Sequence, residues 1–171
     1  MKFFYRFILI ILVVLAFNTP TKAMGQFLFM QGNPLVGKAA PEFSLNMAVS
    51  GKKMSLTDYR AGNKAIIFFW ATWCPHCRVQ LKTLNDSKAE IESKGIKVAL
   101  VDLDEDRSIV KGYVQKLKIE YDVFLDEGGV VGDQYGLVGV PTFIFVDEDG
   151  VVKAVEHSLP EDYESLFAGQ S

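Results

Sequence analysis

The stretch that decides the fold is WATWCPHC, residues 70–77, which holds both cysteines of the chain. It follows KAIIFFWA, residues 64–71, a continuous apolar run of the length expected for a buried central strand. After it, Gly95 ends a segment in which apolar side chains recur at helical spacing, at Cys77, Leu81, Leu84 and Ile91. A strand that leads into a helix here places Cys74 at the helix N-terminus, where unpaired N–H groups and the helix dipole stabilise an anion.

The residue types of this motif suit disulfide exchange. A thiolate is the nucleophile of that reaction, so the stabilised anion would be the Cys74 sulfur. Cys77 returns to the same helical face three residues later and can attack a mixed disulfide formed by Cys74. Pro75 fits the first helical turn, and an imidazole at His76 would favour the thiolate and make the disulfide more oxidising. We therefore predict that Cys74 and Cys77 are catalytic and that Pro75 and His76 tune their potential.

Two other uses of the cysteine pair are a structural crosslink and a metal site. A crosslink across two intervening residues closes a very short loop and would stabilise the fold little. A zinc site needs four protein ligands, or three and a water molecule. The chain has two cysteines, and the one histidine outside the motif is His157, far along the sequence. We predict no metal site, and copper bound by both cysteines and His157 stays open as an alternative.

The first 23 residues are typical of an export signal. Lys2 and Arg6 precede an apolar run at residues 7–17, which is short for a membrane span but suits the core of a signal peptide. Because residues 3–17 are nearly all apolar, an uncleaved membrane anchor stays open as an alternative. Either interpretation predicts an exported protein, periplasmic or on the outer face of the cytoplasmic membrane, where disulfides form and persist.

Composition narrows the function classes. The apolar fraction of 49% supports a real hydrophobic core. The chain has 18 basic and 21 acidic residues, and three of the basic ones lie in the first 23 residues. The remaining negative charge gives no electrostatic footprint for nucleic acid, so we expect no nucleic-acid partner. Residues 24–35 are predicted to form a linker and residues 36–171 a single domain.

Within that domain, strand and helix signals alternate. In chain order they predict a hairpin with its turn at 50–52, a helical turn capped by Thr57, strand 64–71, the helix after the cysteines, strand 97–104, helix 109–117, strand 121–126, a loop or short helix at 127–137, a hairpin at 142–157 turning at Asp149-Gly150, and a closing helix at 160–167. Helices that link buried strands imply parallel pairs, and hairpins add antiparallel ones. The predicted fold class is α/β, a mixed central sheet flanked by helices with an N-terminal β-hairpin.

Two stretches carry a family resemblance. FFWATWCPHC at 68–77, with GVPTFIFVDEDG at 139–150, resembles the thioredoxin-like superfamily, in particular the exported TlpA/ResA-type thiol–disulfide oxidoreductases. The likeness covers about residues 36–168 and includes the entry segment GKAAPEFSL at 37–45. It implies a thioredoxin-like fold and exchange of a Cys74–Cys77 disulfide with cysteine-containing protein substrates. The resemblance favours the reducing direction, with a second redox protein that recycles the pair and no cofactor besides the disulfide.

The resemblance also assigns residues that spacing alone does not. It implies that the Val140–Pro141 peptide bond is cis, with Pro141 against the cysteines where it helps bind the partner polypeptide. Trp73 resembles the exposed surface tryptophan of the family and is expected to contact substrate, as are Val140 and Pro141. Trp70 is expected in the core.

The chain departs from the family pattern at two acidic positions. Thioredoxins carry a buried aspartate where this chain has Phe68, and TlpA/ResA-type proteins often carry a glutamate where it has Gln80. Both acids are thought to handle the proton of the second cysteine, so the proton acceptor for Cys77 is open.

Three other functions remain as alternatives: a disulfide-forming oxidant, a metal-binding or chaperone module that uses the cysteine pair, and a peroxidase. Peroxiredoxins share the general fold and a similar entry segment. Their active sites typically have threonine three residues before the reactive cysteine. In this chain Ala71 occupies that position.

Overall fold

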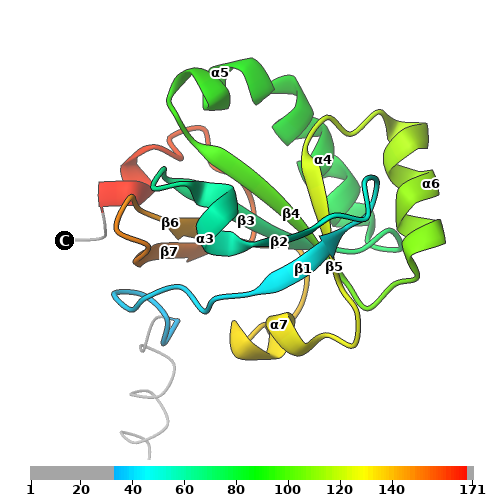
Figure 1. The fold of residues 1–171 in the computed structure, drawn as a ribbon. Helices are drawn as coiled ribbons and strands as arrows, with labels where there is room; N and C mark the ends of the chain where they lie inside the picture. Colours follow the sequence, from blue (N-terminus) through cyan, green and yellow to red (C-terminus); the bar gives the residue numbers. More distant parts are fainter. Residues whose placement is uncertain (1–32, 169–171) are drawn as a thin grey trace, which may run out of the picture. The chain divides into compact units, whose positions relative to one another are not determined.

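Strand β3, Ala65–Trp70, forms the centre of the fold, and all six of its residues are buried. The computed structural model describes residues 33–168, and in it β3 pairs in parallel with β4, Lys97–Leu103, and antiparallel with β6, Thr142–Val146. The sheet has the strand order β2-β1-β5-β4-β3-β6-β7 (Figure 1). Its other strands are β1 Ser44–Met47, β2 Lys53–Ser55, β5 Asp122–Asp126 and β7 Val152–Glu156.

Helices cover both faces of this sheet. One apolar cluster joins β3 and β4 to helices α4 (Pro75–Asp86), α5 (Lys88–Ser93) and α6 (Arg107–Leu117), and it contains Trp70 and both cysteines. The cluster on the opposite face includes Leu56 of α3 (Leu56–Arg60) and Val131 of α7 (Val130–Gln134). The mixed sheet flanked by helices is the predicted fold class, which is therefore confirmed, and Trp70 is fully buried as expected.

The predicted N-terminal hairpin is present, but the predicted helix cap is wrong. β1 and β2 pair antiparallel, and Gly51 turns the chain between them with a φ of 70°. Helix α3 begins at Leu56, so Ser55 is its N-cap and accepts a hydrogen bond from the backbone N–H of Asp58 at 3.0 Å. The Thr57 hydroxyl lies two residues past the N-cap and instead donates to a carboxylate oxygen of Glu42, at 2.7 Å.

Two helix predictions need correction. The segment after the cysteines is two helices, because the chain leaves helical geometry at Ser87. Just before the break, the Asn85 side chain bonds the backbone of Lys118 and Glu120, beyond the end of α6. The closing helix predicted at 160–167 is instead a series of turns and a short 3₁₀ helix, Ser165–Ala168. So short a segment does not hold a helix by itself, and its position is set by Phe167, whose ring packs edge-on against Phe145.

The C-terminal hairpin β6–β7 is present as predicted, and a buried arginine closes its turn. Gly150 adopts a φ of 85° in the turn. Arg60, at the end of α3, donates from Nη2 to the carbonyl oxygens of Asp147 and Glu148, at 2.5 and 3.0 Å. This contact fixes the turn at the end of the sheet that lies away from the cysteines.

The export signal at 1–23 and most of the linker at 24–35 lie outside the described residues. Between residues 33 and 168, no helix combines the length and apolar character needed to cross a membrane.

The buried ring of Phe68 is a sensitive point of the core. It stacks on Phe143 with ring centroids 4.2 Å apart, and both are fully buried. We expect Phe68→Ala to lower the free energy of unfolding by about 3–5 kcal/mol, because it leaves a cavity. Urea unfolding of the disulfide form measures this, with Val138→Ala at a 94% exposed side chain as the control, for which about 0.5 kcal/mol or less is expected. A loss of similar size in both variants would contradict the assigned packing.

Candidate active site

The two cysteines meet at the junction of β3 and α4. They form a disulfide with Cα atoms 5.3 Å apart. Cys74 is the N-cap of α4, and its sulfur accepts a hydrogen bond from the backbone N–H of Cys77 at 3.1 Å. Pro75 is the first residue of the helix, where the backbone N–H that proline lacks would have no partner within the helix. The expected geometry at the helix N-terminus is confirmed, while the tuning role of Pro75 remains a prediction.

The two sulfur-bearing residues differ in access to solvent. The exposed fraction of Cys74 is 4% and that of Cys77 is zero. Trp73 is 69% exposed, and His76 lies exposed in the first turn of α4. Cys74 is therefore the more accessible of the two cysteines, and the exposed side chains of Trp73 and His76 lie near it in sequence. The roles of Trp73 in substrate binding and of His76 in tuning the potential remain predictions.

The cis-proline loop lies against the disulfide. The Val140–Pro141 bond is cis, as the family resemblance implied. The carbonyl oxygen of Val140 lies 3.8 Å from the Cys74 sulfur, and the Thr142 hydroxyl donates to the carbonyl oxygen of Gly139 at 2.8 Å. The structure thus brings together Cys74, Val140 and Pro141, three of the predicted site residues, from segments 66 residues apart in sequence.

Neither departure from the family pattern supplies an acid. Phe68 is packed on Phe143 in the core. Gln80 uses its side-chain oxygen to accept a hydrogen bond from the backbone N–H of Leu159, at 2.9 Å. The amide of Gln80 therefore joins α4 to the segment that follows β7.

A buried acid that the sequence analysis did not single out lies on the neighbouring strand. Asp102 is the register partner of Trp70 and is fully buried. Because side chains alternate along a strand, Asp102 points to the same face as Val98 and Leu100, which pack in one cluster with Cys77. Burial and then the nearby acid Glu105 raise the pKa of Asp102 to about 8, so this carboxyl group is largely protonated at neutral pH.

Glu105 connects that buried acid to the loop before Cys74. Its carboxylate accepts a hydrogen bond from the backbone N–H of Thr72 at 2.6 Å and another from the Thr72 hydroxyl. The carboxylate oxygens of Asp102 have no hydrogen-bond donor among the described residues. A protonated Asp102 resolves this, because it can donate its hydrogen to Glu105 instead of facing it as a second carboxylate. The pair thus supports the loop that carries the nucleophile.

A signal for Asp102 was present in the sequence. It interrupts KVALVDLD, an otherwise apolar strand, and an acid within a buried strand is uncommon enough to indicate a special environment. Its place beside Trp70 and the contact of Glu105 with Thr72 depend on strand order, which periodicity does not give.

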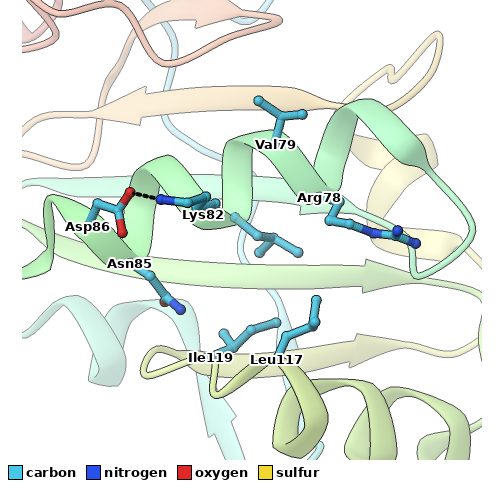
Figure 2. Close-up of a pocket in the computed structure, with 8 residues that line it drawn as sticks. Arg78, Val79, Lys82, Asn85, Asp86, Leu117 and Ile119 are labelled. Carbon is cyan, nitrogen blue, oxygen red and sulfur yellow. Dashed lines mark hydrogen bonds and ion pairs between the residues drawn. The ribbon is translucent and has the colours of Figure 1, made fainter.

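A cavity lies between α4 and α6 and does not include the disulfide among its lining residues. It has a volume of about 520 Å³ between α4 and the end of α6, with Val79, Leu81, Leu117 and Ile119 as its apolar walls (Figure 2). The Lys82–Asp86 ion pair lies on its rim. Among the described residues, no group of three or more potential ligands is arranged to hold a metal ion.

The raised pKa of Asp102 predicts a pH-dependent stability. Between about pH 3.8 and 8, Asp102 holds a proton in the folded protein that it releases in the unfolded chain. The contribution of this proton to the free energy of unfolding is therefore complete below that range and is lost as pH rises through it. We therefore expect the free energy of unfolding of Asp102→Asn, relative to that of the wild type, to be higher at about pH 9 than at about pH 5. The expected rise is at least about 1.4 kcal/mol, which corresponds to a change of one pH unit in a pKa. Urea unfolding at both pH values measures the difference.

Asp133→Asn, at an exposed acid of α7, is the control for this measurement. Its difference from the wild type should be the same at both pH values. If Asp102→Asn shows an equally constant difference, the acid is not protonated on folding.

Gln80 offers a test of proton handling at Cys77. Gln80→Glu keeps an oxygen for Leu159 and adds a carboxylate one helical turn after Cys77, so we expect the midpoint of the pH dependence of disulfide reduction to move by about 1 pH unit. Stopped-flow reduction by dithiothreitol measures it. Gln80→Leu, which removes the hydrogen bond without adding charge, should keep the wild-type midpoint. An unchanged profile in Gln80→Glu removes position 80 from the proton transfer.

Two proteins with similar sequences carry names that refer to thiol–disulfide chemistry. The thiol-disulfide oxidoreductase ResA of Bacillus thuringiensis is 32% identical over 117 residues, which cover 68% of this chain and 66% of that protein. The thiol:disulfide interchange protein DsbE of Yersinia pestis is 30% identical over 154 residues, 88% of this chain and 80% of that one. The chain thus spans just under two thirds of this ResA and more of the DsbE.

A solved structure agrees with these relatives. The thioredoxin domain of a thiol-disulfide oxidoreductase from Bacteroides vulgatus matches with a TM-score of 0.68 and 25% identity, over 77% of this chain and 94% of that domain. These likenesses confirm the resemblance to ResA-type proteins and the thioredoxin-like fold. The model of the AhpC/TSA family matches residues 36–155, so the chain belongs to the AhpC/TSA family.

Proposed function

We propose that this chain is an exported thiol–disulfide oxidoreductase that reduces disulfides of partner proteins through Cys74 and Cys77. The observation that carries the proposal is a disulfide at the N-terminus of α4 with the cis Val140–Pro141 bond against it. The names of the curated relatives, a thiol-disulfide oxidoreductase and a thiol:disulfide interchange protein, support the same class of reaction.

In the reducing direction, the Cys74 thiolate attacks one sulfur of the partner's disulfide, forms a mixed disulfide and releases one partner thiolate. Cys77 then loses its proton and attacks the Cys74 sulfur, which closes the Cys74–Cys77 disulfide and releases the second partner thiolate. Two electrons pass to the partner in these steps. The greater exposure of Cys74 supports this order of attack. Because the disulfide carries both electrons, the proposal includes no organic cofactor.

Two features of the chain bear on the direction of electron flow, and they favour opposite directions. The likeness to ResA-type proteins favours a reductant. The N–H of Cys77 at the Cys74 sulfur and the neighbouring His76 favour the thiolate, which would raise the potential and make the pair an oxidant. We give the family likeness more weight, and an oxidant is the alternative.

The partners in this proposal are cysteine-containing proteins and a second redox protein that restores the dithiol. Trp73, Val140 and Pro141 form the place where the partner polypeptide docks. The exported location rests on the signal-like residues 1–23, and residues 3–17 would hold the protein on the membrane if they are retained. Disulfide exchange suits such a compartment, because disulfides persist there.

The reduction potential of the Cys74–Cys77 pair tests the direction. We expect a value near about −270 mV, as in a thioredoxin-type reductant, from equilibration with dithiothreitol or glutathione buffers and quantification of thiols. A value near about −120 mV contradicts the reducing role and supports an oxidant. In the same preparation, reduction of insulin by dithiothreitol should be accelerated by the wild type and not by Cys74→Ser. Hydrogen peroxide turnover in place of disulfide reduction would support a peroxidase.

A further inference from the structure

His157 borders the cis-proline loop. It follows directly after β7, and the antiparallel pairing of β7 with β6 brings it to the start of β6. Its Nδ1 atom lies 3.0 Å from the carbonyl oxygen of Pro141 and 3.3 Å from the hydroxyl oxygen of Thr142. Since the carbonyl oxygen of Val140 is 3.8 Å from the Cys74 sulfur, the imidazole lies beside the place where a partner must approach that sulfur.

These contacts determine which ring nitrogen carries the hydrogen. The carbonyl oxygen of Pro141 can only accept a hydrogen bond. The Thr142 hydroxyl has one hydrogen, and it is donated to the carbonyl oxygen of Gly139 at 2.8 Å. Both neighbours therefore present lone pairs to Nδ1 of His157, so Nδ1 must be the protonated nitrogen. In the neutral ring, Nε2 is then a bare acceptor.

The chain around His157 is held on its other side by α4. Two residues further on, the backbone N–H of Leu159 donates to the side-chain oxygen of Gln80 at 2.9 Å. The segment 157–159 is thus fixed to the cis-proline loop at one end and to the cysteine-bearing helix at the other. His157 is nevertheless exposed, so its ring is held in place while one nitrogen stays accessible.

We propose that His157 is a partner-binding residue of the exchange reaction, whose Nε2 atom accepts a hydrogen bond from a main-chain N–H of the polypeptide that docks across Pro141. This inference rests on the proposed function. A main-chain N–H is present at every residue except proline, so the contact fits partners of varied sequence. It adds a binding group, at the end of β7, to the docking place proposed for Trp73, Val140 and Pro141.

The substitution His157→Asn separates the two ring nitrogens. An asparagine amide can still donate to the Pro141 carbonyl oxygen, but it has no atom at the position of Nε2. With insulin as the probe and dithiothreitol as the reductant, at about pH 8 where a free imidazole is neutral, we expect KM for insulin to rise about 2- to 10-fold, the effect of one net hydrogen bond. The value of kcat and the reduction potential of the cysteine pair should stay unchanged. Ser158→Ala, at the exposed neighbour, is the control and should keep the wild-type KM.

The tautomer has a test of its own that needs no partner. Long-range ¹H–¹⁵N spectra at the same pH should show Nδ1 of His157 protonated and Nε2 bare, with the His157→Asn variant identifying its signals against those of His76. The opposite tautomer overturns the inference, as does a wild-type KM or a changed reduction potential in His157→Asn. If instead the wild type does not reduce insulin while the tautomer is as stated, the proposed function fails and the imidazole geometry stands.

Discussion

The sulfur of Cys74 caps helix α4, and the site is arranged around that contact. It accepts the N–H of Cys77, one of the helix N–H groups that have no partner within the helix. When the disulfide is reduced, the same donor and the helix dipole face a thiolate, so the local structure that starts the helix also stabilises the reactive anion. Strand β3 fixes the position of Cys74, because both faces of the strand are buried in the core and the chain leaves the sheet soon after Trp70.

Residues at the open end of the C-terminal hairpin make three contacts, one with that sulfur, one within the hairpin and one with α4. Val140 presents its carbonyl oxygen, His157 holds Pro141, and Leu159 donates to Gln80 on α4. The side chain at position 80 is thus part of the scaffold. The acid that the family resemblance led us to look for at this position is absent, and the buried acid in register with the end of β3 is Asp102.

The sequence was informative where function depends on local spacing. The strand–CPHC–helix junction and the hairpin at Asp149-Gly150 depend on neighbouring residues, so periodicity and turn chemistry predict them. The cis bond at Pro141 came from family likeness, since residue types alone favour trans. Asp102 and His157 gain their meaning from contacts between strands distant in sequence, and no local pattern contains the strand order. The missing closing helix shows the converse, because Phe167 packing overrides a weak helical signal.

The contact of Arg60 with the turn of the C-terminal hairpin has a consequence for the cis-proline loop at the other end of the same hairpin. Its guanidinium holds the carbonyl oxygens of Asp147 and Glu148 and lies so close to Gly150 that a methyl group there would come within 3.0 Å of it. The turn and the side chains that both strands bury together set the pairing of β6 with β7. That pairing places His157 beside Pro141. A change at Arg60 can therefore reach the cis-proline loop through the pairing of the two strands.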